Sequence, residues 1–322
     1  MRFDLTEDQR EIRDVARGFL RERAPIDTVR ADADRGGGDP ALWRDVVELG
    51  WPGIAVAEEH GGQGLDAVTL AVLLEEAGLA CLSTPLASTA TVAAVLQACG
   101  TDEQRATWLP RLTSGEVTAG LGVTDLVVDG PGAAVALLLD DEPRLVIDPD
   151  VAPVTTVDPT RPAGRMRGGR SEPLPAEAAH RARTAIAAEL VGVGQRALDL
   201  AVAYAKDREQ FGRPIGAFQA VAHRCARMLL EVESGRSTVH HAAWAADADR
   251  DRLHEAAALA AASAAIGARE ATAGAIQVHG GIGFTWEADL HWLYKRAQVD
   301  TALLGGIATH RRALGRMAVG RG

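Results

Sequence analysis

The chain has 322 residues, 47% of them hydrophobic and 24% charged, with a formal net charge of -10 at pH 7. This length accommodates two or three domains with a sizeable core. The acidic balance argues against non-specific nucleic-acid binding, which depends on clustered cations. Three widely spaced cysteines, Cys81, Cys99 and Cys225, lack metal-ligand spacing and indicate reduced thiols in a cytoplasmic protein.

Residues 1–115 carry helical patterns and are expected to form an N-terminal helical domain. The first residues have no basic stretch followed by an apolar run, so no signal peptide is expected, and no segment is apolar for long enough to span a membrane. Thr6 and Gln9 form a capping box, and apolar residues follow at helical spacing. Residues 31–39, with three glycines, are expected to be a flexible loop, and residues 51–57 to be extended.

Residues 116–175 favour short strands and are expected to form a shortened middle β domain. Apolar runs separated by Asp-, Gly- and Pro-rich turns occur at 126–128, 134–139, 145–147 and 151–157. The segment 160–175 is rich in Arg, Gly and Pro, and is expected to cross the surface.

Residues 176–322 return to helical patterns. Long alanine-rich helices are expected from about 185, over 221–247 and over 253–278, with a shorter one from 290. The fold class predicted is therefore mostly α: an N-terminal helical domain, a truncated middle β region and a C-terminal four-helix bundle.

A turn between two of these helices carries groups that suit a nucleotide. Arg208 offers a planar cation for phosphate, Gln210 an amide, and Phe211 a ring on which an adenine could stack. From the residues alone, a polar loop between helices explains this segment equally well.

Five segments together resemble the acyl-CoA dehydrogenase family in the family's order along the chain. They are 42–54, 58–64, 208–219, 277–285 and 294–297. The resemblance implies an FAD cofactor, an acyl-CoA thioester substrate and α,β-dehydrogenation, in which a carboxylate removes the α-proton. It also implies that the adenine dinucleotide end of each FAD is held by a neighbouring subunit.

The resemblance assigns cofactor-binding roles to residues of the two C-terminal motifs. Arg208 would meet the pyrophosphate, and Phe211 the adenine or its surroundings. The other residues implied at this site are Gln210, Phe218, Gln219, Gln277, Gly280 and Gly281. A glycine lets the backbone approach a ligand closely because it has no Cβ.

The chain departs from the family pattern at the catalytic base. Leu304 and Ala182 occupy the family's two positions for the catalytic Glu, and neither side chain can accept a proton. Asp300 and His291 lie near the lost base and are either relocated bases or solvated residues. Glu189 is expected to be structural.

Arginines near these positions have no assigned role. Arg183 is either a functional contact or a surface ion pair, and the tail arginines face solvent, a partner or the CoA phosphates.

The middle β region also lacks about half of the family's domain, by comparison with typical domain sizes.

These departures resemble the short subunits of heteromeric family members that degrade steroids. The resemblance implies a full-length acyl-CoA dehydrogenase partner in an α2β2 heterotetramer, FAD shared across unlike interfaces, a bulky and possibly steroid-derived acyl-CoA, and an electron-transfer flavoprotein as acceptor. Two alternatives remain open: a non-enzymatic stabilising subunit without flavin, and a homomeric flavoenzyme with a relocated base. No nucleic-acid or membrane partner is expected.

Overall fold

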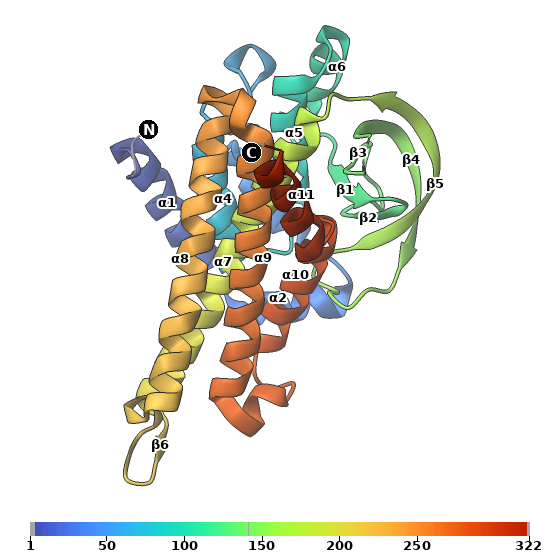
Figure 1. Cartoon of the computed structure of the whole chain (residues 1–322). Coiled ribbons are helices and arrows are strands. Elements are labelled where there is room, and N and C mark those ends of the chain that lie inside the picture. Colours follow the sequence, from blue (N-terminus) through green and yellow to red (C-terminus); the bar gives the residue numbers. More distant parts are fainter. Residues whose placement is uncertain (1–3, 141, 321–322) are drawn as a thin grey trace.

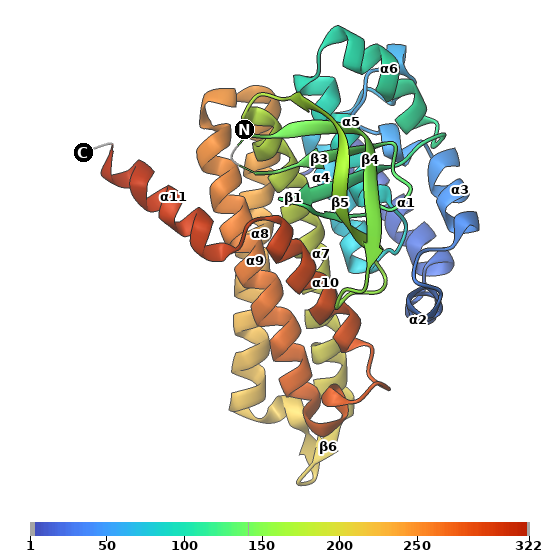
Figure 2. The same cartoon turned by 90° about the vertical axis from the view of Figure 1, so that its right-hand side faces the viewer.

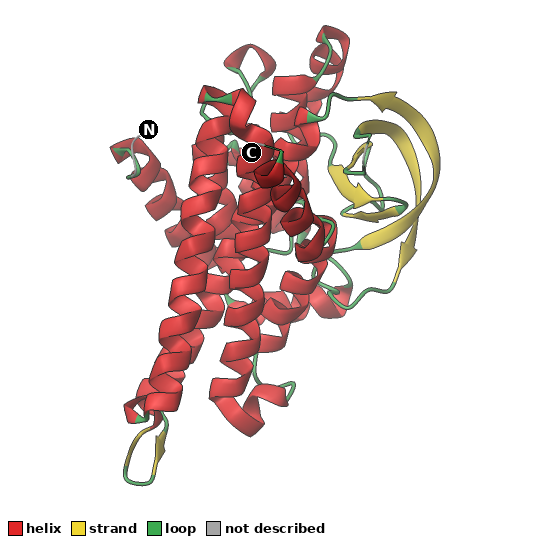
Figure 3. Ribbon diagram, in the orientation of Figure 1, coloured by secondary structure: helices red, strands yellow, loops and turns green. Residues whose placement is uncertain are grey.

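A computed structural model describes residues 4–140 and 142–320. Helices form two packed groups, and a small β-barrel lies against one side of them (Figures 1 and 3). The mostly helical architecture with a small β region confirms the predicted fold class. Among the described helices, none combines the length and the apolar character needed to cross a membrane.

The N-terminal group contains six α-helices and two short 3₁₀ turns. They are α1 (Glu7–Arg23), α2 (Ile26–Arg35), α3 (Pro40–Glu48), η1 (Trp51–Gly53), η2 (Glu58–His60), α4 (Ala67–Leu79), α5 (Leu86–Cys99) and α6 (Asp102–Thr113). The capping box predicted at the start of α1 is present, since the Thr6 hydroxyl accepts from the Gln9 backbone and the Gln9 side chain accepts from the Thr6 backbone.

Two local predictions in this group are wrong. Helix α2 continues to Arg35 through the first part of the loop expected over 31–39, and Gly36 caps it in a left-handed conformation, so only 36–39 form the loop. Residues 51–57 are not extended, because Trp51–Gly53 forms a 3₁₀ turn. Gly53 packs there against the backbone of Gly62, where a side chain would have no room.

Five strands close into a barrel in the order β1-β2-β5-β4-β3. They are β1 (Ala119–Val123), β2 (Leu126–Val128), β3 (Val135–Leu138), β4 (Arg144–Val154) and β5 (Ala163–Pro173). The segment predicted to cross the surface is exposed over most of its length, and it forms the long strand β5, which pairs with β4. The separate strand predicted over 151–157 is mainly the second half of β4.

The C-terminal group is built on three long antiparallel helices and two shorter ones. They are α7 (Glu177–Asp207), α8 (Gln219–Ala248), α9 (Arg250–His279), α10 (Leu290–Leu303) and α11 (Ile307–Val319), with η4 (Gly280–Phe284) between α9 and α10. The basic tail is helical as α11, which extends away from the rest of the molecule in Figure 2.

Two glycines bring the helical groups into backbone contact. A Cβ on Gly78 of α4 would lie 2.1 Å from the carbonyl oxygen of Glu189, and one on Gly192 of α7 would lie 1.9 Å from that of Glu75. Helices α4 and α7 therefore cross at a distance that only glycine permits. This contact fixes the N-terminal group against the bundle.

Candidate functional site

The predicted nucleotide loop forms a small β-hairpin at one end of the bundle. Strands β6 (Glu209–Gln210) and β7 (Arg213–Pro214) pair around a two-residue turn. Both turn residues have positive φ, 53° at Phe211 and 76° at Gly212, as in the type I′ turns that favour Asn or Gly at these positions. A phenylalanine in this conformation is strained, and such strain often marks a functional site.

The polar and aromatic groups of this hairpin point into solvent. Phe211 is 93% exposed, and its ring meets the edge of Phe218 with centroids 6.1 Å apart. The Gln210 side chain donates to the Glu209 carbonyl oxygen at 2.7 Å. The Arg208 side chain forms no hydrogen bond or ion pair with any described residue, so its guanidinium is available to an external anion.

Arg213 is a further member of this group that sequence reasoning missed. Its guanidinium carbon lies 4.1 Å from the centre of the Phe218 ring, a cation–π contact. Arg213 and Phe218 lie five positions apart in the sequence, and this spacing could have indicated their contact. The hairpin thus presents two arginines beside two aromatic rings.

The second motif ends helix α9. Gly280 has φ 64° and ψ -137°, a backbone conformation that residues with a side chain rarely adopt. A Cβ placed on Gly280 or Gly281 would meet no atom within 4 Å, so open space lies beside this backbone. Gln277, in the last turn of α9, is exposed. A ligand could therefore approach the main chain here.

A ring stack holds the two motifs together. Tyr204 in the last turn of α7 lies parallel to His279 at the end of α9, with ring centroids 4.2 Å apart. The hairpin and η4 accordingly lie at the same end of the bundle (Figures 1 and 2). The structure thus collects all eight predicted cofactor-binding residues at one end, on an open surface and not in an enclosed cavity.

The two expected base positions lie inside the protein. Ala182 is 0% exposed and Leu304 is 1% exposed. Next to them, Arg183 donates to the carbonyl oxygen of Leu139 at 2.9 Å, and His310 hydrogen-bonds the carbonyl oxygen of Leu304. Both base positions therefore carry aliphatic side chains in packed surroundings.

A buried ionic network joins the barrel, the bundle and the N-terminal helices. It consists of Arg161, Arg296, Asp129, Asp158, Glu189 and Asp300, whose side chains are at most 4% exposed.

Glu189 of α7 is the centre of this network. Its two oxygens accept from Arg161 at 2.9 Å and from Arg296 at 2.8 Å. Arg161 also binds Asp129 from the barrel and Asp300 from α10, and Arg296 also binds Asp158. No group of described His, Cys, Asp or Glu residues could hold a metal ion, so the arginines supply the positive charge here.

Asp300 is not the solvated residue that the sequence suggested as one possibility. It is 0% exposed, and burial raises its pKa well above the ordinary value, with the neighbouring Glu189 adding to the effect. Its Oδ2 atom has no hydrogen-bond partner among the described residues. A carboxyl group held this way is sealed from any substrate.

His291 is packed between two tryptophan rings. Its ring packs against Trp286 and Trp292 at the start of α10, with centroids 4.9 Å and 4.1 Å away. Both candidates for a relocated base are therefore engaged in packing or pairing. Glu189 is structural in the same sense, because both of its oxygens bind arginines.

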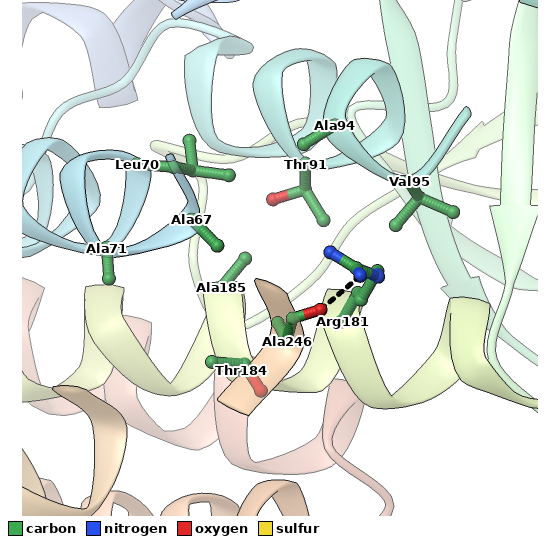
Figure 4. Close-up of a pocket in the computed structure, with 10 residues that line it drawn as sticks. All are labelled: Ala67, Leu70, Ala71, Thr91, Ala94, Val95, Arg181, Thr184, Ala185 and Ala246. Atoms are coloured by element: carbon green, nitrogen blue, oxygen red, sulfur yellow. Dashed lines mark hydrogen bonds between the residues drawn. The ribbon is translucent and has the colours of Figure 1, made fainter. Parts of the chain in front are cut away.

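A small pocket between α4, α5, α7 and α8 is too small for a substrate. Figure 4 shows Arg181 pointing into it from α7 and donating to the carbonyl oxygen of Ala246. The remaining lining is mostly alanine, leucine, valine and threonine, and the space is about 30 Å³. A drug-sized ligand needs a pocket of roughly 300 to 1,000 Å³.

Comparison with known proteins decides the family. Residues 6–116 match the model for the N-terminal domain of acyl-CoA dehydrogenases, and residues 174–319 match that for their C-terminal domain. Over 310 residues the chain is 35% identical to the acyl-CoA dehydrogenase IpdE2 of Mycolicibacterium smegmatis, covering 94% of this chain and 96% of the relative. The chain belongs to the acyl-CoA dehydrogenase family.

Solved structures agree with this membership of a family of oxidoreductases. A variant of the Tcur3481–Tcur3483 steroid ACAD aligns over 98% of this chain and 99% of its own, with a TM-score of 0.87 and 28% identity. The ChsE4–ChsE5 complex of Mycobacterium tuberculosis aligns over 99% of both chains with a TM-score of 0.88, and at 23% identity it shows the fold alone. Both structures therefore share the fold along nearly the whole of this chain.

Proposed function

We propose that this chain is a catalytically incomplete subunit of a heteromeric, FAD-dependent acyl-CoA dehydrogenase. It contributes the dinucleotide half of an FAD site whose ring half and catalytic Glu belong to a full-length partner. One contrast carries the proposal: the dinucleotide-binding groups are exposed at the end of the bundle, while both base positions, Ala182 and Leu304, are buried and aliphatic.

The exposed end of the bundle suits the dinucleotide. Arg208 and Arg213 can pair with a pyrophosphate, Phe211 offers an open face for adenine, and Gly280 and Gly281 leave room for a phosphate or ribose beside the main chain. Because these groups lie on an open surface, a second protein must close the site. When bound, FAD would accept the two electrons removed from the acyl-CoA.

The interior of the chain does not suit the flavin ring. The junction of barrel, α7 and α10 is filled by the ionic network around Glu189. The ring and the substrate are therefore assigned to the partner, in an α2β2 heterotetramer with FAD at unlike interfaces. This chain would bind and orient the dinucleotide and would not move the substrate proton.

The proposed substrate class, a steroid-derived acyl-CoA, is supported by a similar solved structure. The 28% identical structure is described as a steroid ACAD and carries two protein names, which supports a heteromer that acts on a bulky, steroid-derived acyl-CoA. An electron-transfer flavoprotein remains the proposed electron acceptor.

Co-expression with a full-length acyl-CoA dehydrogenase subunit tests the proposal. We expect the complex, and not the chain alone, to carry flavin and to dehydrogenate an acyl-CoA. Arg208→Ala should lower the flavin content of the complex, whereas the matched change Arg227→Ala, at an exposed arginine on α8, should leave it unchanged. Full activity from the chain alone would favour the homomeric enzyme, and a complex without flavin would favour the stabilising subunit.

A further inference from the structure

The buried ionic network contains more negative than positive groups. Two arginines, Arg161 and Arg296, face four carboxyl groups, and none of the six side chains is more than 4% exposed. If every group were ionised, two negative charges would remain unbalanced within the network. Burying an unpaired charge is costly, and a carboxyl group usually takes up a proton instead. The balance of charges therefore indicates that the network holds at least one proton.

The hydrogen bonds that each carboxyl group accepts identify where this proton lies. Asp129, Asp158 and Glu189 each accept at least two from described donors. Asp300 accepts a single one, from Arg161 to Oδ1 at 2.7 Å, and its Oδ2 atom has no partner among the described residues. Accepted hydrogen bonds stabilise the charged form of a carboxyl group. Asp300 accepts the fewest, so it is the group that loses least when it is protonated.

Glu189 opposes a negative charge on Asp300. The same nitrogen of Arg161, Nη1, donates to Asp300 at 2.7 Å and to Glu189 at 2.9 Å, so the two carboxyl groups lie side by side. Two carboxyl groups this close disfavour each other's ionisation, and one of the pair keeps its proton. Burial, with Glu189 next in effect, accordingly raises the pKa of Asp300 well above its ordinary value. The other titratable and charged groups that face Asp300 are Arg161, Arg296, Asp158 and, from the connection between α4 and α5, the thiol of Cys81.

We propose that Asp300 is protonated at Oδ2 in the folded protein at neutral pH, and that this proton lets the network clamp α10 and the β4–β5 connection onto α7. When the proton is lost at higher pH, a second negative charge lies beside Glu189 with no further donor, and the clamp weakens. Above about pH 5 an unfolded Asp is ionised while folded Asp300 keeps its proton, so stability falls as the pH rises towards the pKa of Asp300. The inference concerns the chain by itself and does not rest on the proposed function.

Urea unfolding of the full chain between about pH 5 and pH 9 tests the inference. Asp300→Asn keeps the shape of the side chain and cannot ionise, and both proteins share the titration of His180. Relative to this variant, the unfolding equilibrium constant of the wild type should rise about tenfold per pH unit until the proton is lost. The control Asp158→Asn removes a carboxylate with three donors, so it should lower stability at every pH and keep the wild-type slope. Parallel curves for the wild type and Asp300→Asn would overturn the inference.

Infrared spectroscopy of the wild-type chain gives a second readout that does not depend on a variant folding. A protonated carboxyl group has a carbonyl stretching band that a carboxylate lacks. At neutral pH, carbon-13 labelling of aspartate should shift such a band, and labelling of glutamate should not. Asp300→Asn should lower its intensity more than Asp129→Asn does. A wild-type spectrum without the band, a shift on glutamate labelling alone, or an intensity unchanged in Asp300→Asn would each contradict a proton on Asp300.

Discussion

The guanidinium of Arg161 lies 2.7 Å from the carboxylate of Asp300, 139 residues later in the chain. This contact joins the connection between β4 and β5 to helix α10. Burial opposes the charge on Arg161, yet Glu189, Asp129 and Asp300 raise its pKa, so it stays protonated.

Removing this arginine should strongly destabilise the protein. Arg161→Met leaves three buried carboxylates short of a partner, and breaking a buried pair typically lowers the free energy of unfolding by about 3 to 5 kcal/mol. Urea unfolding measures the effect. Arg165→Met, at an exposed arginine two strand positions into β5, should change it by less than about 0.5 kcal/mol. Equal effects of the two changes would contradict a structural role for the network.

The crossing of α4 and α7 should not tolerate a methyl group. Gly78→Ala places a Cβ against the carbonyl oxygen of Glu189, so we expect the free energy of unfolding to fall by about 1 to 3 kcal/mol. Gly18→Ala is the matched control, because nothing lies within 4 Å of its Cβ position inside α1 and alanine should stabilise that helix by about 0.5 to 1 kcal/mol. A neutral Gly78→Ala would show that the helices can separate.

Restoring a carboxylate at the base position should not restore catalysis. Leu304→Glu buries an unpaired carboxylate among apolar groups, so we expect a lower melting temperature. We also expect no dehydrogenation of acyl-CoA by the chain alone, measured by reduction of a dye acceptor. Leu304→Met keeps the position apolar and should melt close to the wild type. Activity gained by the Glu variant would mean that this chain retains a usable substrate cavity.

The strained conformation of Phe211 should lower the stability of the free chain, while its exposed ring should favour cofactor binding. Phe211→Gly removes the penalty of a positive φ on a bulky residue, so the free chain should be as stable as the wild type or slightly more so in thermal unfolding. The assembled complex should hold less flavin, because the exposed ring is lost. Unchanged flavin content would show that Phe211 does not contact the cofactor.

Acid should destabilise the protein through His180. Its ring stacks on His254 with centroids 4.7 Å apart, and burial, with the neighbouring His254 next in effect, lowers its pKa to about 4. Between about pH 6.5 and 4 the unfolded chain binds more protons at this residue than the folded chain, so stability falls as the pH falls through this window.

The variant His180→Gln should therefore lose less stability between pH 7.5 and pH 5 than the wild type, as measured by urea midpoints. His223→Gln, at an exposed histidine on α8, should behave like the wild type. Parallel losses in all three proteins would exclude His180 as the source of the acid sensitivity.

Local signals in the sequence predicted much of the fold. The capping box at Thr6 and the long alanine-rich runs define helices through neighbouring residues, and both are present. The loop of Arg208 was identified because its residue types lie within a short stretch of the chain. That stretch did not reveal the Tyr204–His279 stack, which joins two helix ends far apart in sequence.

Distant partners explain what the sequence did not predict. Strand β5 contains several Arg and Gly residues, and it is a strand because β4 and β2 pair with its two edges. Arg161 is buried only because Glu189 and Asp300 meet it from helices 28 and 139 residues away. A composition typical of a surface loop was outweighed by tertiary contacts in both cases.

The barrel pairs β1 with both β2 and β3 and so closes on itself, which gives each of its five strands a neighbour on both sides. An open edge recruits strands from other molecules and leads to aggregation. A shortened β region that did not close would carry that hazard. Closure therefore protects the shortened β region against strand exchange with other molecules.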